Sequence, residues 1–316
     1  MDKANQQTYK TLSVHSSPFH LEKDWKLFCE NKNKNCSQKE VDILIAKEIL
    51  NTIDLEIMRI LAEYGYVNTY NITYALSARL PDSYKKDSYQ RNFRKMVRAG
   101  ILLKYCIHTN DSPTAPYATP LRIYCLSPGA HAYMAPHISV PFPKRLVLSQ
   151  TCILDCLAVS QLLIRFLDTY SGQCTAQPFI YRRIGSQRNI IFDGIIRFNP
   201  VAKMSQRPLQ IILISIRDSS NIFTKYASHV TAAQRVAAID AKKYRTIIVI
   251  VTESLNLIRI LVKHLPSSTD DKSFYSPVYF TFDSLLCTDT LFTSLFTAAS
   301  DDNGNASTLE RIRFMT

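Results

Sequence analysis

The chain has 316 residues, a length typical of two domains, and 46% of them are hydrophobic, which is enough to bury a core and excludes a disordered chain. The formal net charge is +12 at pH 7 and the isoelectric point is about 9.3. This balance favours an anionic partner, which could be a nucleic acid, an anionic membrane or an acidic protein, and it leaves the fold open.

The sequence argues against a membrane protein and against a zinc protein. No apolar run approaches the roughly 18 residues that a spanning helix needs. The first residues, MDKANQQTYKTLSVHSS, lack the apolar core of a signal peptide. The 8 cysteines contain no Cys-x-x-Cys pair and no finger spacing with histidine. We therefore expect a cytoplasmic protein with reduced thiols, no metal and no membrane contact.

The first part of the chain predicts a flexible arm followed by a small DNA-binding domain. Residues 1–37 are polar and read as a loose arm with a short helix around Trp25–Phe28. Helical periodicity then predicts four helices, over 38–50, 52–64, 68–77 and from Asp87 or Ser88 to Gly100. Two strands follow, at 101–107 and 121–127, with a Pro- and Thr-rich loop between them. This order is that of a winged helix-turn-helix, which we assign to residues 38–135.

The last of these helices carries an unusual concentration of positive charge. In RNFRKMVRAGILLKY (91–105) apolar residues recur on one face, and Arg91, Lys95 and Arg98 share another. A solvated helix usually mixes charges of both signs, but no acid follows Asp87 here. The phosphates of DNA would neutralise such a face through the release of counterions.

In a winged helix-turn-helix the third helix, which directly precedes the wing, enters the major groove, and the wing reaches the neighbouring DNA backbone. The residues that we expect at the DNA lie on this helix, just before it, just after it and at the crown of the wing: Lys85, Lys86, Ser88, Gln90, Arg91, Arg94, Lys95, Arg98, Lys104 and Tyr117. The sequence leaves open which of them read bases and which only hold phosphates.

The second part of the chain predicts a larger α/β domain. A proline-rich linker spans 136–146, and a long helix opens a domain over 147–299. Three strands, a helix, a strand, a helix and a final strand follow, which is typical of a three-layer α/β domain. The tail, 300–316, reads as flexible up to its last few residues. The whole chain is thus of α+β or α/β class with two domains.

The order of elements in the second domain resembles that of the PD-(D/E)xK nucleases, whose fold is the restriction-endonuclease-like one. The resemblance implies an acid on the second strand, and Asp193 in IIFDGII matches it. It also implies a Glu-x-Lys pair on the third strand that helps hold a divalent metal. This chain has Ser215-x-Arg217 there, and Gln234 on the next helix stands where many members carry glutamine.

These departures favour binding without catalysis. Serine cannot supply the second anionic ligand, and arginine has no accessible neutral form. Between Arg182 and Arg245 basic residues far outnumber acids. If the domain were nonetheless a nuclease, it would use Mg²⁺ with Asp193, Arg217 and Gln234 as candidate residues. Asp155 or Asp218 would then have to supply the missing acid.

The chain as a whole resembles, over about Thr52–Leu265, the replication-relaxation family encoded on plasmids and integrative elements. The resemblance implies a non-catalytic, double-stranded DNA-binding protein that acts as an accessory or regulatory factor in plasmid replication or conjugative transfer. A relaxase or replication protein would be a further partner. Two alternatives stay open: a metal-dependent nuclease with a rearranged site, and an interaction or dimerisation module that recruits other DNA-processing proteins, in which case a homodimer is expected.

Overall fold

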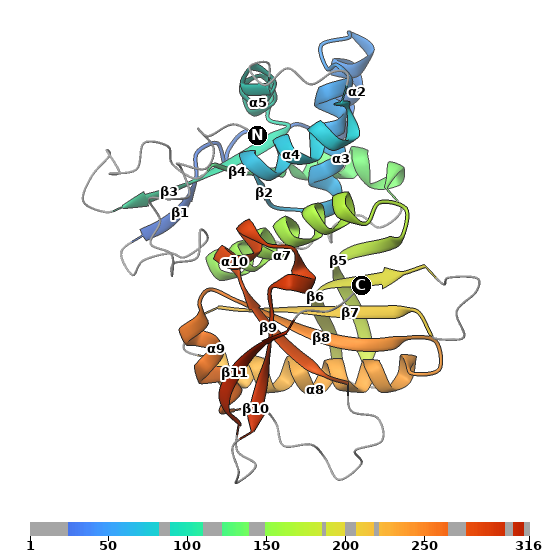
Figure 1. The fold of residues 1–316 in the computed structure, drawn as a ribbon. Helices are drawn as coiled ribbons and strands as arrows, with labels where there is room; N and C mark the ends of the chain where they lie inside the picture. Colours follow the sequence, from blue (N-terminus) through green and yellow to red (C-terminus); the bar gives the residue numbers. More distant parts are fainter. Residues whose placement is uncertain are drawn as a thin grey trace. The chain divides into compact units, whose positions relative to one another are not determined.

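The computed structural model describes residues 25–81, 89–109, 122–138, 149–184, 188–199, 207–217, 221–264, 276–300 and 306–312. It is a mixed α/β structure with helices and two β-sheets (Figure 1). The chain divides into two compact units, one spanning Leu21–Asp168 and the other containing Thr169–Thr316. Each unit is described by itself.

The first unit contains the helices that the periodicity predicts. They are α2 (Gln38–Ala46), α3 (Thr52–Tyr64), α4 (Thr69–Arg79), α5 (Tyr89–Arg98), α6 (Pro128–Met134), the short η2 (Ala135–His137) and α7 (Gln150–Thr169). The four predicted between residues 38 and 100 are confirmed. Two begin with a capping box, Ser37 with Glu40 in α2 and Asn51 with Asp54 in α3, which satisfies amide groups that the first turn leaves unpaired.

The sheet of this unit has four antiparallel strands in the order β1-β3-β4-β2. They are β1 (Trp25–Cys29), β2 (Val67–Asn68), β3 (Leu102–Thr109) and β4 (Arg122–Leu126). The two predicted strands are β3 and β4. The short helix predicted around Trp25–Phe28 is wrong, because these residues form β1 and pair with β3 along their whole length. A five-residue edge strand is too short for periodicity to identify it.

The segment after β1 is held firmly, so the predicted flexible arm does not extend over residues 25–37. The Asn31 side chain donates to the carbonyl of Leu102 at 2.8 Å, and its oxygen accepts from the Lys104 amide at 2.8 Å. The Cys36 amide donates to the carbonyl of Gly100 at 3.0 Å. A Cβ atom added to Gly129 on α6 would lie 2.0 Å from the Cys36 carbonyl oxygen. Only glycine allows the two backbones to approach so closely.

Helix α7 belongs to the first unit, whereas the sequence placed it at the start of the second domain. The Ser160 hydroxyl donates to the carbonyl of Tyr64 at 3.0 Å, and the Tyr74 hydroxyl donates to Asp168 at 2.5 Å. Among the described residues α7 alone has the length and apolar composition of a membrane-spanning helix, which the search for apolar runs missed. Yet 72% of its apolar window is buried in the protein, as in the core helix of a globular domain.

The second unit is built on a seven-stranded sheet in the order β11-β10-β9-β8-β7-β6-β5. The strands are β5 (Cys174–Ile184), β6 (Arg188–Phe198), β7 (Leu209–Ile216), β8 (Arg245–Thr252), β9 (Val278–Phe282), β10 (Leu295–Ser300) and β11 (Ala306–Ile312). Its helices are α8 (Ile222–Asp240), α9 (Leu255–Val262), α10 (Asp283–Thr288) and the short η4 (Leu291–Thr293).

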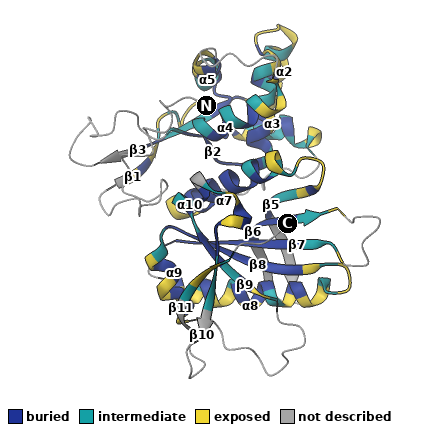
Figure 2. Cartoon of the chain, viewed as in Figure 1, coloured by how far each residue is buried: buried dark blue, intermediate teal, exposed yellow. Residues whose placement is uncertain are grey.

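The centre of this sheet is parallel and its core is continuous. β7, β8 and β9 run parallel, and α8 makes the crossover between the first two. β7 and β8 are nearly unbroken apolar runs because both of their faces are covered (Figure 2). The buried cluster joins Ile212 and Ile250 of these strands with Tyr226 and Val230 of α8.

The edges of the sheet differ from what the sequence predicts. The final strand was expected to be β9 and the tail to be flexible, but β10 and β11 form an antiparallel hairpin beyond it. Its pairing brings Leu309 of the predicted tail against the core cluster. At the other edge Phe179, next to Pro178, has a positive φ of 50°, while the β5–β6 register is the same on both sides of it.

We predict that Gly129→Ala lowers the free energy of unfolding of the first unit by about 3 kcal/mol, because the new methyl group would overlap the Cys36 backbone. Gly172→Ala is the comparison. Its φ is 74° but nothing lies within 4 Å of the added atom, so the cost is about 1 kcal/mol. Urea unfolding measures both changes. A Gly129→Ala protein as stable as the wild type would show that α6 does not pack on Cys36.

Candidate nucleic-acid interface

Helix α5 presents two chemically different faces. Tyr89, Asn92, Phe93 and Met96 are buried. The Phe93 ring stacks on Tyr124 of β4 with ring centroids 4.7 Å apart, which fixes the helix against the sheet. Gln90, Arg91, Arg94 and Arg98 are exposed. The apolar and basic faces predicted from the sequence are thus both present.

A buried carboxylate anchors α5 to α3. The Asp54 side chain is fully buried and accepts hydrogen bonds from the Asn51 amide at 2.8 Å and from the Asn92 side chain at 2.7 Å. Lys95 of α5 forms an ion pair with the same carboxylate and also donates to the carbonyl of Ile49 at 3.0 Å. Every one of these contacts of Asp54 is with a group that orients α5 or caps α3.

Two of the lysines expected at the DNA are engaged inside the unit. Lys95 is paired with Asp54, and the Lys104 ammonium lies 2.6 Å from a carboxylate oxygen of Glu30. Asp54 and Glu30 lie far along the chain from Lys95 and Lys104. The sequence around α5 therefore shows no acid, although the fold brings these two acids to the lysines. Lys95 and Lys104 serve to hold the unit together, and we remove them from the set of candidate DNA contacts.

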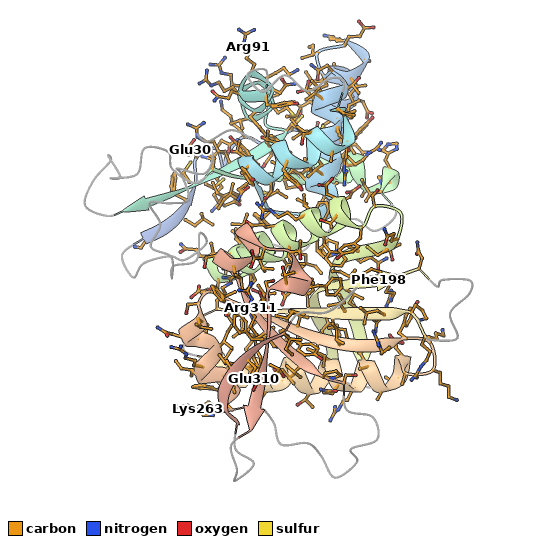
Figure 3. The ribbon with its side chains drawn as sticks, viewed as in Figure 1. Glu30, Arg91, Phe198, Lys263, Glu310 and Arg311 are labelled. Atoms are coloured by element: carbon orange, nitrogen blue, oxygen red, sulfur yellow. The ribbon has the colours of Figure 1, made fainter. Side chains whose placement is uncertain are left out.

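Three arginines remain as the exposed basic face of α5: Arg91, Arg94 and Arg98. Figure 3 shows Arg91 on the outer side of the helix, pointing away from the rest of the unit. These arginines, with Lys95 and Ala99, line an open hollow of about 570 Å³. Within the described part of the chain none of the three has an acid at ion-pair distance. Lys85, Lys86, Ser88 and Tyr117, also expected at the DNA, lie outside the described residues.

The nuclease-like candidates of the second unit lie on three elements: Asp193 on β6, Ser215 and Arg217 at the carboxyl end of β7, and Gln234 on α8. Asp193 on β6 is 9% exposed, and its carboxylate accepts a hydrogen bond from the Ser215 amide on β7 at 2.7 Å. The structure thus brings together the two strands that the resemblance pairs. The contact uses the Ser215 backbone, so Asp193 helps to fix the register of the two strands.

Arg217 is committed to an acid that the sequence did not single out. Its guanidinium and the Asp283 carboxylate form a two-pronged ion pair in which the second nitrogen–oxygen distance is 3.0 Å. Both side chains are 1% exposed. Asp283 directly follows β9, and Glu253, 8% exposed, directly follows β8. An acid immediately after a buried parallel strand was the available signal.

Gln234 has a structural role. Its side-chain amide donates to the carbonyl of Ser276 at 2.8 Å and accepts from the Ser276 amide at 2.9 Å. This reciprocal pair holds the segment that leads into β9. Both ends of the amide thus have a partner within the unit. Asp218, one proposed source of a missing acid, lies outside the described residues, and Asp155 is buried on α7.

The acids of the described residues do not gather into a metal centre. No three His, Cys, Asp or Glu side chains among those residues are placed to hold an ion together. A nuclease metal needs clustered carboxylates that concentrate negative charge. Here a guanidinium occupies the ion-pairing position next to Asp283. The arrangement can stabilise the sheet.

Two of the described thiols, Cys106 and Cys125, are unsuited to a reactive site. Burial raises the pKa of the Cys125 thiol to about 12. Burial, followed by a hydrogen bond to Glu30, raises the pKa of Cys106 to about 12. Both therefore stay protonated at neutral pH and are poor nucleophiles. Of the two cysteines on α7, Cys156 is buried and Cys152 is exposed.

We predict that replacing Lys95 lowers the stability of the protein, whereas replacing its neighbour Arg94 weakens DNA binding. Lys95→Gln removes the cation paired with buried Asp54 and should lower the free energy of unfolding by about 1–3 kcal/mol. Arg94→Gln removes an exposed cation and should change it by less than about 0.5 kcal/mol while weakening the binding of duplex DNA. Thermal unfolding and DNA titration of each variant measure the two effects. Equal loss of DNA binding without loss of stability would return Lys95 to the interface.

Comparisons of the chain with protein-family models, with curated proteins and with solved structures found no match. The family resemblance drawn from the sequence therefore stays a prediction. The function has to be inferred from the charges, contacts and burial of the described residues.

Proposed function

We propose that the protein binds double-stranded DNA through the exposed face of α5, within a winged helix-turn-helix unit. The order of elements supports this proposal: α3, the short β2, α4, α5, then the β3–β4 hairpin. β2 pairs with β4, the last strand, and β4 pairs with β3. In a winged helix-turn-helix the helix in the position of α5 is the one that enters the major groove.

The observation that carries the proposal is the set of three arginines on one face of α5. Arg91, Arg94 and Arg98 follow one another at intervals of three and four residues, so they share a stripe about 10 Å long. The unit neutralises its other α5 cation, Lys95, internally. Exposed like charges in a row repel one another unless an anion lies between them. A guanidinium can hold a phosphate or the edge of a guanine with two parallel hydrogen bonds.

We propose further that the second unit has a restriction-endonuclease-like core that does not cleave DNA. The antiparallel β5-β6-β7 meander followed by α8 and the parallel β8 supports the first part. Serine at position 215, the pairing of Arg217 with Asp283 and the use of Gln234 by Ser276 support the second. The protein would thus act as an accessory or regulatory factor.

The wider role follows from the resemblance to the replication-relaxation family. We propose that the DNA belongs to a plasmid or integrative element and that binding serves its replication or transfer, with a relaxase or replication protein as partner. A footprint on the DNA of the element that encodes the protein would identify the bound sequence.

We predict that Arg91→Gln/Arg94→Gln/Arg98→Gln weakens the binding of duplex DNA by at least about tenfold at low salt. The slope of log K against log salt should become shallower by about 2.7, which is about 0.9 for each lost phosphate contact. Fluorescence anisotropy over a series of salt concentrations measures both quantities. If one of the arginines reads a base, its single replacement by alanine should cost about 1–3 kcal/mol and relax specificity at one position.

The matched control removes three exposed cations from other parts of the same unit, Lys32, Lys39 and Arg59, each replaced by glutamine. Its net charge equals that of the α5 variant, so a general effect of charge would appear in both proteins. If both proteins lose affinity and salt dependence equally, α5 is not the interface.

We predict that the wild-type protein leaves supercoiled plasmid intact in Mg²⁺ or Mn²⁺. Asp193 is bonded to a backbone amide and Arg217 to Asp283, so a metal would find one acid and a competing cation. Gel electrophoresis distinguishes supercoiled from nicked and linear DNA. Nicking by the wild type that disappears in Asp193→Ala would overturn the non-catalytic assignment.

A further inference from the structure

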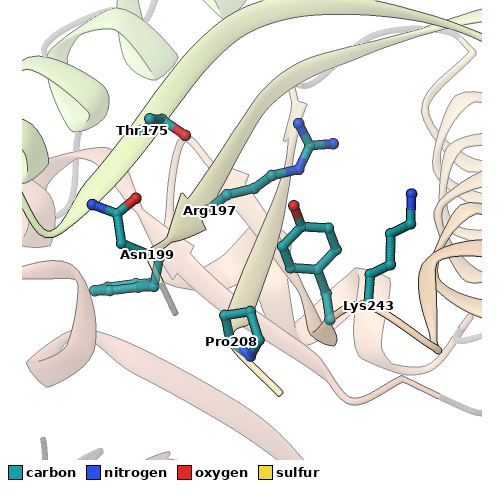
Figure 4. A pocket seen from close by; sticks show the side chains of 7 residues that line it. Thr175, Arg197, Asn199, Pro208 and Lys243 are labelled. Carbon is teal, nitrogen blue, oxygen red and sulfur yellow. The ribbon is translucent and has the colours of Figure 1, made fainter. Parts of the chain in front are cut away.

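The second unit has a basic hollow at the end of its sheet opposite to Asp283. It measures about 450 Å³ and is lined by residues from the start of β5, the end of β6 and the segments leading into β7 and β8: Thr175, Arg197, Phe198, Asn199, Pro208, Lys243 and Tyr244. Two of these residues are cations and none is an acid. The charged ends of Arg197 and Lys243 point to the same side of the hollow (Figure 4).

Arg197 is held in a fixed orientation by two contacts. Its Nε donates to the side-chain oxygen of Gln210 at 2.8 Å, and Gln210 is fully buried. Its guanidinium carbon lies 5.5 Å from the centre of the Tyr244 ring, within the range of a cation–π contact. These contacts use Nε and one face of the guanidinium. The two terminal nitrogens, which can hold a phosphate in a fork, have no acid near them among the described residues.

The residues around Arg197 leave the hollow positively charged. Thr175, Arg197 and Gln210 lie opposite one another on three neighbouring strands, so they form one row across the sheet. The acid Asp240 accepts from the other end of the Gln210 amide at 3.3 Å. Gln210 thus separates Asp240 from Arg197. Lys243 is exposed, and no partner of its ammonium is found among the described residues.

We propose that this hollow binds a backbone phosphate of nucleic acid, so that the second unit has its own nucleic-acid contact, independent of α5. The oriented guanidinium of Arg197, the exposed ammonium of Lys243 and the Thr175 hydroxyl are donors suited to a phosphate oxygen. The hollow is open, which fits a group on a long chain better than an enclosed small molecule. The contact would position the protein on the backbone and read no sequence.

The test is Arg197→Gln/Lys243→Gln in the full-length chain, made both in the wild type and in the variant that lacks the three α5 arginines. With labelled duplex DNA of random sequence, anisotropy should show an affinity lower by about threefold to tenfold and a salt slope shallower by about 1.8 in both backgrounds. The loss should persist when α5 is already neutralised. If the α5 proposal is wrong, the α5 variant should bind DNA like the wild type. The effect of replacing Arg197 and Lys243 can still be measured in both backgrounds.

The control removes two exposed arginines of the same unit that do not line the hollow, Arg235→Gln/Arg259→Gln. Arg197→Lys, which keeps the charge but not the fork, should retain the salt slope and lose part of the affinity. Thermal unfolding shows whether each variant is folded, and Lys243→Gln alone, at an exposed site, serves if the double variant is not.

Two results would overturn the proposal. One is equal DNA affinity and salt slope for the hollow variant and its control. The other is a hollow that takes a free nucleotide but no DNA, which would appear as binding of labelled ATP that depends on Arg197 and Lys243 while DNA binding does not.

Discussion

The carboxylate of Asp54 determines how the first unit is assembled. It is fully buried, and it completes the cap of α3 while it binds Asn92 and Lys95 of α5. A buried anion is costly unless its partners surround it, so Asn51, Asp54, Asn92 and Lys95 depend on one another. The orientation of α5, and therefore the direction in which its arginines point, depends on this set.

The second unit neutralises its buried charge in a similar way. Arg217 and Asp283 join β7 to the end of β9, across the intervening β8. Lys95 and Arg217 have acidic partners within their own units, whereas the α5 arginines and the two cations of the hollow have no ion-pair partner among the described residues. Positive charge without an internal partner is thus present on two surfaces where a long polyanion can lie.

Helices and strands with a clear apolar pattern in the sequence were predicted correctly. The 3.6-residue period of α5 and the unbroken apolar runs of β7 and β8 lead directly to their observed structures. Pairings between distant residues were beyond its reach. Lys95 meets Asp54 from 41 positions away, Lys104 meets Glu30 from 74, and Arg217 meets Asp283 from 66. Each of these pairings changes a candidate contact into a structural one. The hairpin of β10 and β11 was missed because LFTAAS and ASTLERI are short and only weakly apolar.

The backbone conformation of Phe179 bears on how copies of this protein can associate. β5 is the outer strand of its sheet, and an outer strand with regularly spaced donors and acceptors can accept a strand from a second molecule. The positive φ at Phe179 interrupts that spacing, and the neighbouring Pro178 has no amide hydrogen to offer. Growth of the sheet from one molecule to the next is therefore disfavoured along β5. The long strand keeps its role within the sheet without offering a template for aggregation.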